Sequence, residues 1–197
     1  MTEQELVQRA KKGDELAFEQ LVTDNEKRIY NLCCRLTGNP DDGAELAQEA
    51  FLNAWRALEK FHGESSFATW LYRLASNACI DFLRREKRRR SLSMTLSLDD
   101  EEESRQAELP DRRFAPEERL AQAEDRRAIA LALESVSAEH RQVLVMREIN
   151  GLSYAEIGQV LGLEEGTVKS RIARARVALR KILVKDGNFS GASSSIT

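Results

Sequence analysis

Cysteine, histidine, proline and long apolar runs are all scarce in this chain of 197 residues. The three cysteines, Cys33, Cys34 and Cys79, are too few and too unevenly spaced for a disulfide framework or a zinc site. The chain has only two histidines, too few for most histidine-based metalloenzymes. No segment approaches the ~20 apolar residues of a membrane span, and the polar N-terminal segment is no signal peptide. We therefore expect the chain to stay in the cytoplasm.

Only three prolines and ten glycines interrupt the chain, which leaves room for long helices. The net charge of −3 is unevenly distributed: residues 1–90 carry no net charge, residues 91–125 carry −7 and residues 126–197 carry +4. Such a distribution predicts two folded lobes joined by an acidic connector. The overall acidity does not exclude a nucleic-acid partner, because binding depends on local patches.

Apolar residues recur at helical spacing in every periodic segment, so we predict an all-α protein made of two small helical domains. Helices are expected over residues 2–11, 14–36, 41–60, 67–90, 117–135 and 138–148, followed by a helix-turn-helix. The Gly38-Asn39-Pro40 segment predicts a stop, with Asp41 and Asp42 as candidate N-caps of the helix that follows.

The periodicity disappears between Ser91 and Pro116, where an acidic run of five residues predicts a flexible, self-repelling linker. The Ser/Gly-rich C-terminal tail is predicted to be disordered. The boundaries that we expect are a first domain at 1–92, the linker at 93–115, a second domain at 116–184 and the tail at 185–197.

Residues 153–184 carry a helix-turn-helix pattern, in which Ser153 can cap the first helix and Gly162 makes the turn. At ~100° per residue, Ser170, Ala173 and Arg174 lie opposite the apolar stripe of the second helix. That stripe consists of Val168, Ile172, Ala175, Leu179 and Ile182. Six basic and no acidic residues lie between 169 and 181. A solvated basic face is the alternative, but the complete pattern favours DNA binding.

Residues 61–90 combine aromatic side chains with a basic end that has six cationic residues in seven. Aromatic rings beside basic residues can stack unpaired bases, and an asparagine such as Asn77 can read a base edge. Phe67 is better explained as ordinary core, whereas Trp70 and Tyr72 fit either interpretation.

The helix predicted over 41–60 leaves Leu52 and Trp55 away from its apolar stripe of Ala47, Ala50, Phe51, Ala54 and Leu58. Large apolar side chains on an exposed face are candidate anchors for a protein partner. The alternative is that a third helix of the same domain covers them.

Three segments together resemble the extracytoplasmic-function (ECF, group IV) sigma factors of bacterial RNA polymerase, in the sigma-70 family. The resemblance covers residues 4–184 and is carried by DDGAELAQEAFLNAWRAL, FHGESSFATWLYRLASNACIDFLRREKRR and GLSYAEIGQVLGLEEGTVKSRIARARVALRK. It implies that residues 1–92 are sigma region 2 and residues 116–184 are sigma region 4.

The resemblance also implies a role for specific residues. Core polymerase binding falls on Leu46, Gln48, Glu49, Leu52 and Trp55. Recognition of the promoter −10 element, with one base flipped into a pocket, falls on Phe61, His62, Gly63, Glu64, Ser65, Ser66, Trp70, Asn77, Arg84, Arg85 and Arg88. Recognition of the −35 element falls on Thr167, Lys169, Ser170, Arg171, Ala173, Arg174 and Arg176.

The partners that the resemblance implies are core RNA polymerase, promoter DNA and an anti-sigma protein, which in this family is often membrane-bound. No cofactor, metal ligand, catalytic residue or small-molecule substrate is expected. A stand-alone helix-turn-helix regulator is the main alternative, yet it gives no role to the aromatic and basic residues of 61–90. An enzyme is a further alternative, but the sequence has neither metal-ligand spacing nor a Gly-rich phosphate loop.

Overall fold

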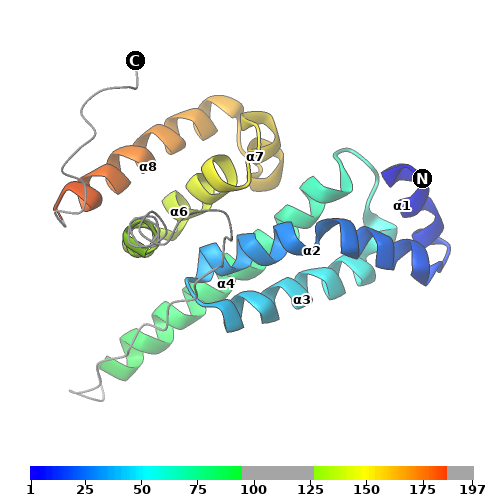
Figure 1. Cartoon of the computed structure of the whole chain (residues 1–197), viewed down its shortest axis with the longest axis horizontal. Helices are drawn as coiled ribbons and strands as arrows, with labels where there is room; N and C mark the ends of the chain where they lie inside the picture. The colour runs from blue at the N-terminus through cyan, green and yellow to red at the C-terminus, as the bar shows by residue number, and fades with distance from the viewer. Residues whose placement is uncertain (95–126, 186–197) are drawn as a thin grey trace, which may run out of the picture.

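The computed structural model describes residues 1–94 and 127–185, which form two helical lobes (Figure 1). We call residues 1–94 lobe one and residues 127–185 lobe two. The predicted linker, apart from its first two residues, and the predicted tail from residue 186 lie outside the described residues. The described residues contain helices and no strand, which confirms the all-α prediction.

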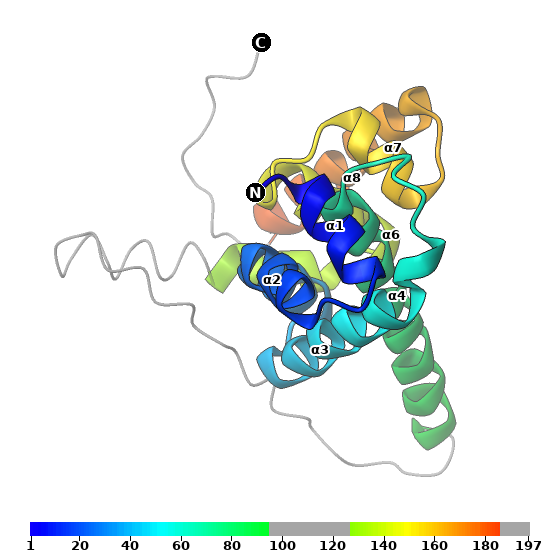
Figure 2. The same ribbon diagram turned by 90° about the vertical axis from the view of Figure 1, so that its right-hand side faces the viewer.

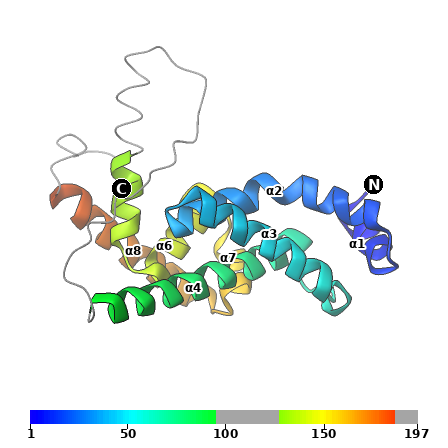
Figure 3. The same cartoon turned by 90° about the horizontal axis from the view of Figure 1, so that it is seen from below.

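Lobe one is a bundle in which α2 packs against the other three long helices. Its elements are α1 (Glu3–Lys11), α2 (Glu15–Thr37), α3 (Pro40–Ala57), the short 3-10 helix η1 (Leu58–Lys60) and α4 (Phe67–Met94). Every helix predicted for this part of the chain is present, within a few residues of its predicted ends. The C-terminal half of α4 extends beyond the bundle on its own (Figures 1 and 3).

Side-chain caps fix where these helices begin. Asp14 caps α2 by accepting from the Ala17 N–H at 3.1 Å, and a hydrogen bond from Arg9 helps to hold the pKa of the Asp14 carboxyl below its ordinary value. The prediction that Asp41 or Asp42 caps α3 is wrong. Asn39 is the cap, because Pro40 occupies the first helical position and the Asn39 side chain accepts from the two N–H groups that follow, at 2.8 and 3.2 Å.

The core of lobe one depends on a close approach of α2 and α3. A Cβ atom at Gly43 would lie 2.5 Å from the Cys34 Sγ and 2.8 Å from the Cys34 backbone, so only glycine fits there. Cys33 and Cys79 are fully buried, and hydrogen bonding between the two thiols together with burial raises the pKa of Cys33. Cys34 is half-buried.

Lobe two comprises a helix over residues 127–135, then α6 (Ala138–Leu144), the π-helical turn η2 (Val145–Ile149), α7 (Tyr154–Leu161) and α8 (Glu165–Lys185). The predicted helix over 138–148 is therefore present, but its last turn widens into η2. The N-terminal part of the helix predicted over 117–135 lies outside the described residues. Side chains of α6, η2, α7 and α8 share one core that includes Val143, Met146, Ile157, Val168 and Ile172.

The two lobes pack against each other, which the sequence did not predict. Helices α6 and α7 lie against α4, and α6 and η2 lie against α2 (Figures 2 and 3). Hydrogen bonds cross this interface from Arg141 to the Leu36 carbonyl and from Asn150 to the Tyr72 hydroxyl, at 2.7 and 3.1 Å. Helix α8 lies on the outer side of lobe two, with α6 between it and lobe one (Figure 1).

Candidate nucleic-acid and partner interfaces

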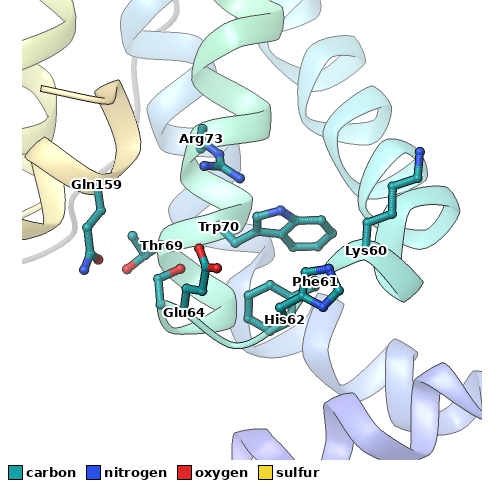
Figure 4. Close-up of a pocket in the computed structure, with 9 residues that line it drawn as sticks. Lys60, Phe61, His62, Glu64, Thr69, Trp70, Arg73 and Gln159 are labelled. Carbon is teal, nitrogen blue, oxygen red and sulfur yellow. The ribbon is translucent and has the colours of Figure 1, made fainter.

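A cavity of about 250 Å³ opens beside the loop of residues 61–66. The centroids of the Phe61 and Trp70 rings lie 5.0 Å apart, with 32° between the ring planes, and the Phe67 ring lies 6.0 and 5.7 Å from them. Polar side chains from the loop, from α4 and from α7 complete the wall (Figure 4). The lining residues are Lys60, Phe61, His62, Glu64, Ser65, Thr69, Trp70, Arg73 and Gln159.

The size and chemistry of this cavity suit a flat, unpaired ring with polar edges. Aromatic side chains supply a stacking surface, and hydroxyl, amide and charged groups supply hydrogen bonds around it. The wall of α4 is fixed at its start by Ser66, whose hydroxyl caps the helix by accepting from the Thr69 N–H at 3.0 Å. The loop thus supplies the cap of the helix that follows it.

A second concave surface lies between α2 and α3. It is an apolar groove with a volume of about 530 Å³, in which the rings of Phe18 and Trp55 meet at 4.8 Å. Leu52 is 54% exposed and Trp55 is 38% exposed, so no helix of the described chain covers them. The groove is lined by Glu15, Phe18, Val22, Gln48, Phe51, Leu52 and Trp55. Exposed apolar surface of this kind is typical of a protein-binding site.

The third surface is the outward face of α8, the second helix of the helix-turn-helix. Gly162 ends α7 in the left-handed conformation with φ of 65°, as the predicted turn requires. Of the predicted apolar stripe, Val168, Ile172 and Ala175 are buried, and Leu179 and Ile182 are half-buried. Thr167, Lys169, Ser170, Ala173, Arg174 and Arg176 are exposed, and Arg171 is half-buried.

The basic groups on α8 are held by nearby partners. Lys169 pairs with Glu165 at 2.6 Å, which raises the pKa of Lys169, and Arg174 donates to the Ser170 carbonyl at 3.2 Å. Arg176 pairs with Glu148 of η2 at 2.7 Å, and this bond raises the pKa of Arg176. Exposed pairs of this kind are weak, so phosphates or base edges can replace the carboxylates at small cost.

Comparison with known families and proteins shows the family to which the chain belongs. Residues 21–89 match the family Sigma-70 region 2, and residues 126–179 match the family Sigma-70, region 4. The ECF RNA polymerase sigma-E factor of Escherichia coli strain K12 is 36% identical over 179 residues, which span 91% of this chain and 93% of the relative. The ECF RNA polymerase sigma factor SigW of Bacillus subtilis strain 168 is 35% identical over 177 residues, spanning 90% and 94%.

The chain is an ECF sigma factor of the sigma-70 family. It is therefore a promoter-specificity factor of RNA polymerase, as the resemblance implied. The solved structure of CnrH in complex with the cytosolic domain of CnrY is similar, with a TM-score of 0.66 and 27% identity over 92% of this chain and 96% of CnrH. The sigma factor RpoE from Bartonella quintana, solved with the anti-sigma factor NepR, shares the fold with a TM-score of 0.66 over 85% of this chain and 96% of RpoE.

Within this sigma factor, the residues expected to read the −10 element occupy two settings. Phe61 and Trp70 are buried and form the floor of the cavity, and Ser65 is half-buried in its wall. The remaining ones are exposed at the loop or along α4: His62, Gly63, Glu64, Ser66, Asn77, Arg84, Arg85 and Arg88. Asn77 lies seven residues after Trp70, about two helical turns further along α4.

Of the residues expected to bind the polymerase, Leu46 does not reach the surface. It is 4% exposed because it lies one turn before Ala50 on the buried face of α3. Gln48, Glu49, Leu52 and Trp55 are exposed, as expected. Leu46 therefore belongs to the core of lobe one in this structure.

Sequence reasoning missed several residues of the cavity, namely Lys60, Thr69, Arg73 and Gln159. Thr69 and Arg73 lie next to and one turn away from Trp70, so their helical spacing could have revealed them. Gln159 comes from lobe two and depends on the packing of the two lobes, for which the sequence holds no local signal.

Among the residues that the structure describes, no three His, Cys, Asp or Glu side chains are grouped to hold a metal ion. None of the helices in the described ranges is long and apolar enough to cross a membrane.

Proposed function

We propose that the three surfaces divide the work of promoter recognition by this sigma factor. The groove between α2 and α3 docks on core RNA polymerase, the cavity beside the loop of residues 61–66 captures an unpaired base of the −10 element, and the face of α8 reads the −35 element in the major groove. The chain acts by binding alone and works in the cytoplasm with the polymerase.

The observation that carries the proposal is the cavity with its aromatic floor of Phe61 and Trp70. A base that has left the duplex stack regains its stacking energy only on such a surface. The cavity opens beside α4, whose exposed Asn77 and protruding basic end continue along one helix. A single strand that enters the cavity can therefore follow the same helix with its bases and phosphates.

The apolar groove supports the polymerase role because it lies on other helices and stays exposed when the lobes are packed together. Its Leu52 and Trp55 are large side chains, which commonly anchor protein interfaces. An anti-sigma protein is the further partner that we infer, since the similar CnrH was solved with the cytosolic domain of CnrY.

The experiment is promoter opening by holoenzyme that carries Asn77→Ala. We expect unchanged affinity for core polymerase and reduced transcription from a duplex promoter, because the strand is held less well after it unpairs. A template already unpaired around the −10 element should restore part of the activity, since the unstacking cost of a few kcal/mol has then been met.

The control is Asn31→Ala, which removes an asparagine from α2, a helix that contributes no residue to the cavity wall. Equal activity of the Asn77 variant and this control on the duplex promoter would refute the −10 assignment. Loss of activity on both templates to the same degree would contradict a role in strand opening.

A further inference from the structure

We propose that α1 is a brace that positions the base-capturing loop of residues 61–66, with Glu3 and Lys11 as positioning residues. This inference rests on the proposed function of the cavity. Helix α1 precedes residue 21, where the match to Sigma-70 region 2 begins, so the family comparison assigns it no role.

The two ends of the loop are each bonded to α1. The Lys11 ammonium donates to the Phe61 carbonyl, where the loop leaves η1. The Glu3 carboxylate accepts from the Phe67 N–H at 2.9 Å, where the loop enters α4. A helix of nine residues therefore bonds to both ends of a segment that has no regular structure of its own.

The bond from Phe67 also acts on α4. The first N–H groups of a helix have no partner within the helix, and a carboxylate is favoured there by the helix dipole. Glu3 thus caps α4 from another helix, beside the local cap from Ser66. Because Thr69 and Trp70 follow within the first turn, this cap fixes the wall of the cavity.

The brace itself is rigid because α1 is well anchored. Leu6, Val7 and Ala10 are buried against the rest of lobe one, and a capping box of Thr2 and Glu5 closes the N-terminus of α1. Glu3 and Lys11 lie on the side of α1 that reaches the loop, and both bonds span more than 45 residues of sequence. Their geometry therefore reflects the tertiary fold and not a local turn.

The test combines the double variant Glu3→Ala with Lys11→Met and the matched control Lys12→Met, which removes the same charge from the neighbouring exposed position. We expect faster amide hydrogen exchange at residues 61–69 in the full-length double variant only. In holoenzyme that carries the double variant, we expect promoter opening to fall about two- to tenfold. A fold-change of this size corresponds to the net contribution of one hydrogen bond. The single variant Lys11→Arg keeps a donor for the Phe61 carbonyl and should retain most of the wild-type promoter opening.

If α1 only stabilised the fold, the double variant would have a lower melting temperature and an unchanged preference for the −10 bases. If α1 positions the loop, the double variant should discriminate less well against substituted −10 bases, and its melting temperature should be nearly unchanged. Unchanged exchange at residues 61–69 would overturn the brace. Faster exchange without any effect on −10 selectivity would contradict the proposed function of the cavity and leave the brace standing.

A different set of contacts leads to a second proposal: we infer that the packed lobes form a closed state in which lobe two guards the cavity. The Arg141 side chain is the centre of this interface and is only 7% exposed. Its guanidinium donates to the Leu36 carbonyl at the end of α2, at 2.7 Å, and to the carbonyls of Leu133 and Glu134, at 2.8 and 2.6 Å. It thereby joins the C-terminal ends of two helices, one from each lobe, where cations are favoured.

The rest of the interface lies along α4, beside the proposed DNA site. Gln142 donates to the Ser76 hydroxyl, and Asn150 donates to the Tyr72 hydroxyl at 3.1 Å. Tyr72 and Ser76 are buried one turn apart, while the adjacent Asn77 is exposed.

Lobe two also reaches the cavity itself. Gln159 of α7 forms part of the cavity wall opposite the loop, facing Thr69 and Glu64 (Figure 4). A strand that enters the cavity and continues along α4 therefore competes with lobe two for the space beside α4. The groove between α2 and α3 is not covered by lobe two, so the closed state can dock on the polymerase before it opens.

The test for closure uses Gln142→Ala with Asn150→Ala, two changes in lobe two that spare α8, and Ser135→Ala as an exposed control in the same lobe. Small-angle X-ray scattering of the free chain should show a larger radius of gyration for the double variant. The probe for binding is the single-stranded −10 strand that holoenzyme selects from a randomised library. We expect it to bind the free double variant about two- to tenfold more tightly than wild type.

Arg141→Lys provides a second variant that keeps the charge but loses the planar fork, and it should shift both measurements in the same direction. Unchanged dimensions in both variants would overturn the closed state. Larger dimensions with unchanged affinity for the strand would show that lobe two does not guard the cavity.

Discussion

On the face of α8 that we propose to read the −35 element, central and peripheral side chains should contact different parts of the duplex. Arg174 lies near the centre of the exposed face and donates to Ser170, whereas Lys169 lies toward the edge of that face beside Glu165. Central positions reach base edges in the major groove, and peripheral ones reach the DNA backbone. The two residues should therefore leave different signatures when they are removed.

We predict that Arg174→Ala costs ~1–3 kcal/mol on the preferred −35 element and relaxes the preference at one base position. Lys169→Ala should weaken binding to all sequences and reduce the salt slope by about 0.9. Holoenzyme binding to a panel of −35 variants across a salt series measures both, with Arg180→Ala as the control that removes the same charge further along α8. A uniform loss for Arg174→Ala over the whole panel would exclude base reading.

Leu46 and Leu52 lie six residues apart on α3 and differ in burial, so they separate stability from partner binding. We predict that Leu46→Ala lowers the free energy of unfolding by about 2–5 kcal/mol, because it empties a site in the core. Leu52→Ala should leave unfolding within about 0.5 kcal/mol of wild type and weaken core polymerase binding. Urea unfolding and a core-binding titration distinguish the two variants. If Leu46→Ala and Leu52→Ala had the same effect in each measurement, the assignment of the groove would be contradicted.

At the scale of helices, hydrophobic spacing was sufficient to predict nearly every element in the described ranges. The stripe of Val168, Ile172 and Ala175 is buried as predicted, because a helix with one apolar face has one way to pack. The cap of α3 was mispredicted because three adjacent polar residues compete for it, and Pro40 decides in favour of Asn39. The π-helical turn η2 has no counterpart in the periodicity of residues 138–148.

The start of α7 provides a prediction about pH. Ser153 and Glu156 form a reciprocal capping box, in which the Ser153 hydroxyl and N–H bond the Glu156 carboxylate, each at 2.7 Å, and hold its pKa below the ordinary value. A carboxyl with a lowered pKa in the folded state stabilises above its unfolded pKa and loses that effect as the pH falls through its folded pKa.

We therefore expect Ser153→Ala to cost about 1 kcal/mol of unfolding free energy at neutral pH. The difference from wild type should shrink once the pH falls below the ordinary carboxyl pKa of about 4.3. Urea unfolding at a series of pH values measures this, with Ser135→Ala as the control, because the Ser135 hydroxyl donates to the Leu131 carbonyl and caps no helix N-terminus. A difference that stays constant down to the lowest pH would show that Glu156 takes no part in the cap.

At the scale of the whole molecule, the sequence indicated the three surfaces but not how they are joined. Lone patterns such as the aromatic residues of 61–70 and the basic face of α8 can be recognised locally. The bonds of Glu3 and Lys11 to the loop, and the approach of Gln159 to the cavity, join residues that are distant in sequence. No periodicity records such contacts, because each depends on how whole helices pack. The acidic connector predicted two lobes, yet the contact between them depends on Arg141, a single arginine in an ordinary amphipathic helix.

Arg141 also determines whether the lobes unfold together. Burial lowers the pKa of its guanidinium and raises the pKa of the nearby Glu134 carboxyl, so the site holds its charges at a desolvation cost that the three carbonyl bonds offset. Arg141→Leu would leave those carbonyls without their donor, and a buried group that loses its partner costs about 1–3 kcal/mol.

We therefore predict that wild type unfolds in one transition and that Arg141→Leu unfolds in two. Lobe two should melt first, because two of the three lost bonds lie within it. Calorimetry of the full chain measures the number of transitions, and hydrogen exchange assigns each to a lobe. His140→Leu, at the neighbouring half-buried position of α6, is the control that should keep a single transition. If wild type already showed two transitions, the interface would not couple the lobes. If the Arg141 variant showed one transition, contacts other than those of Arg141 would couple them.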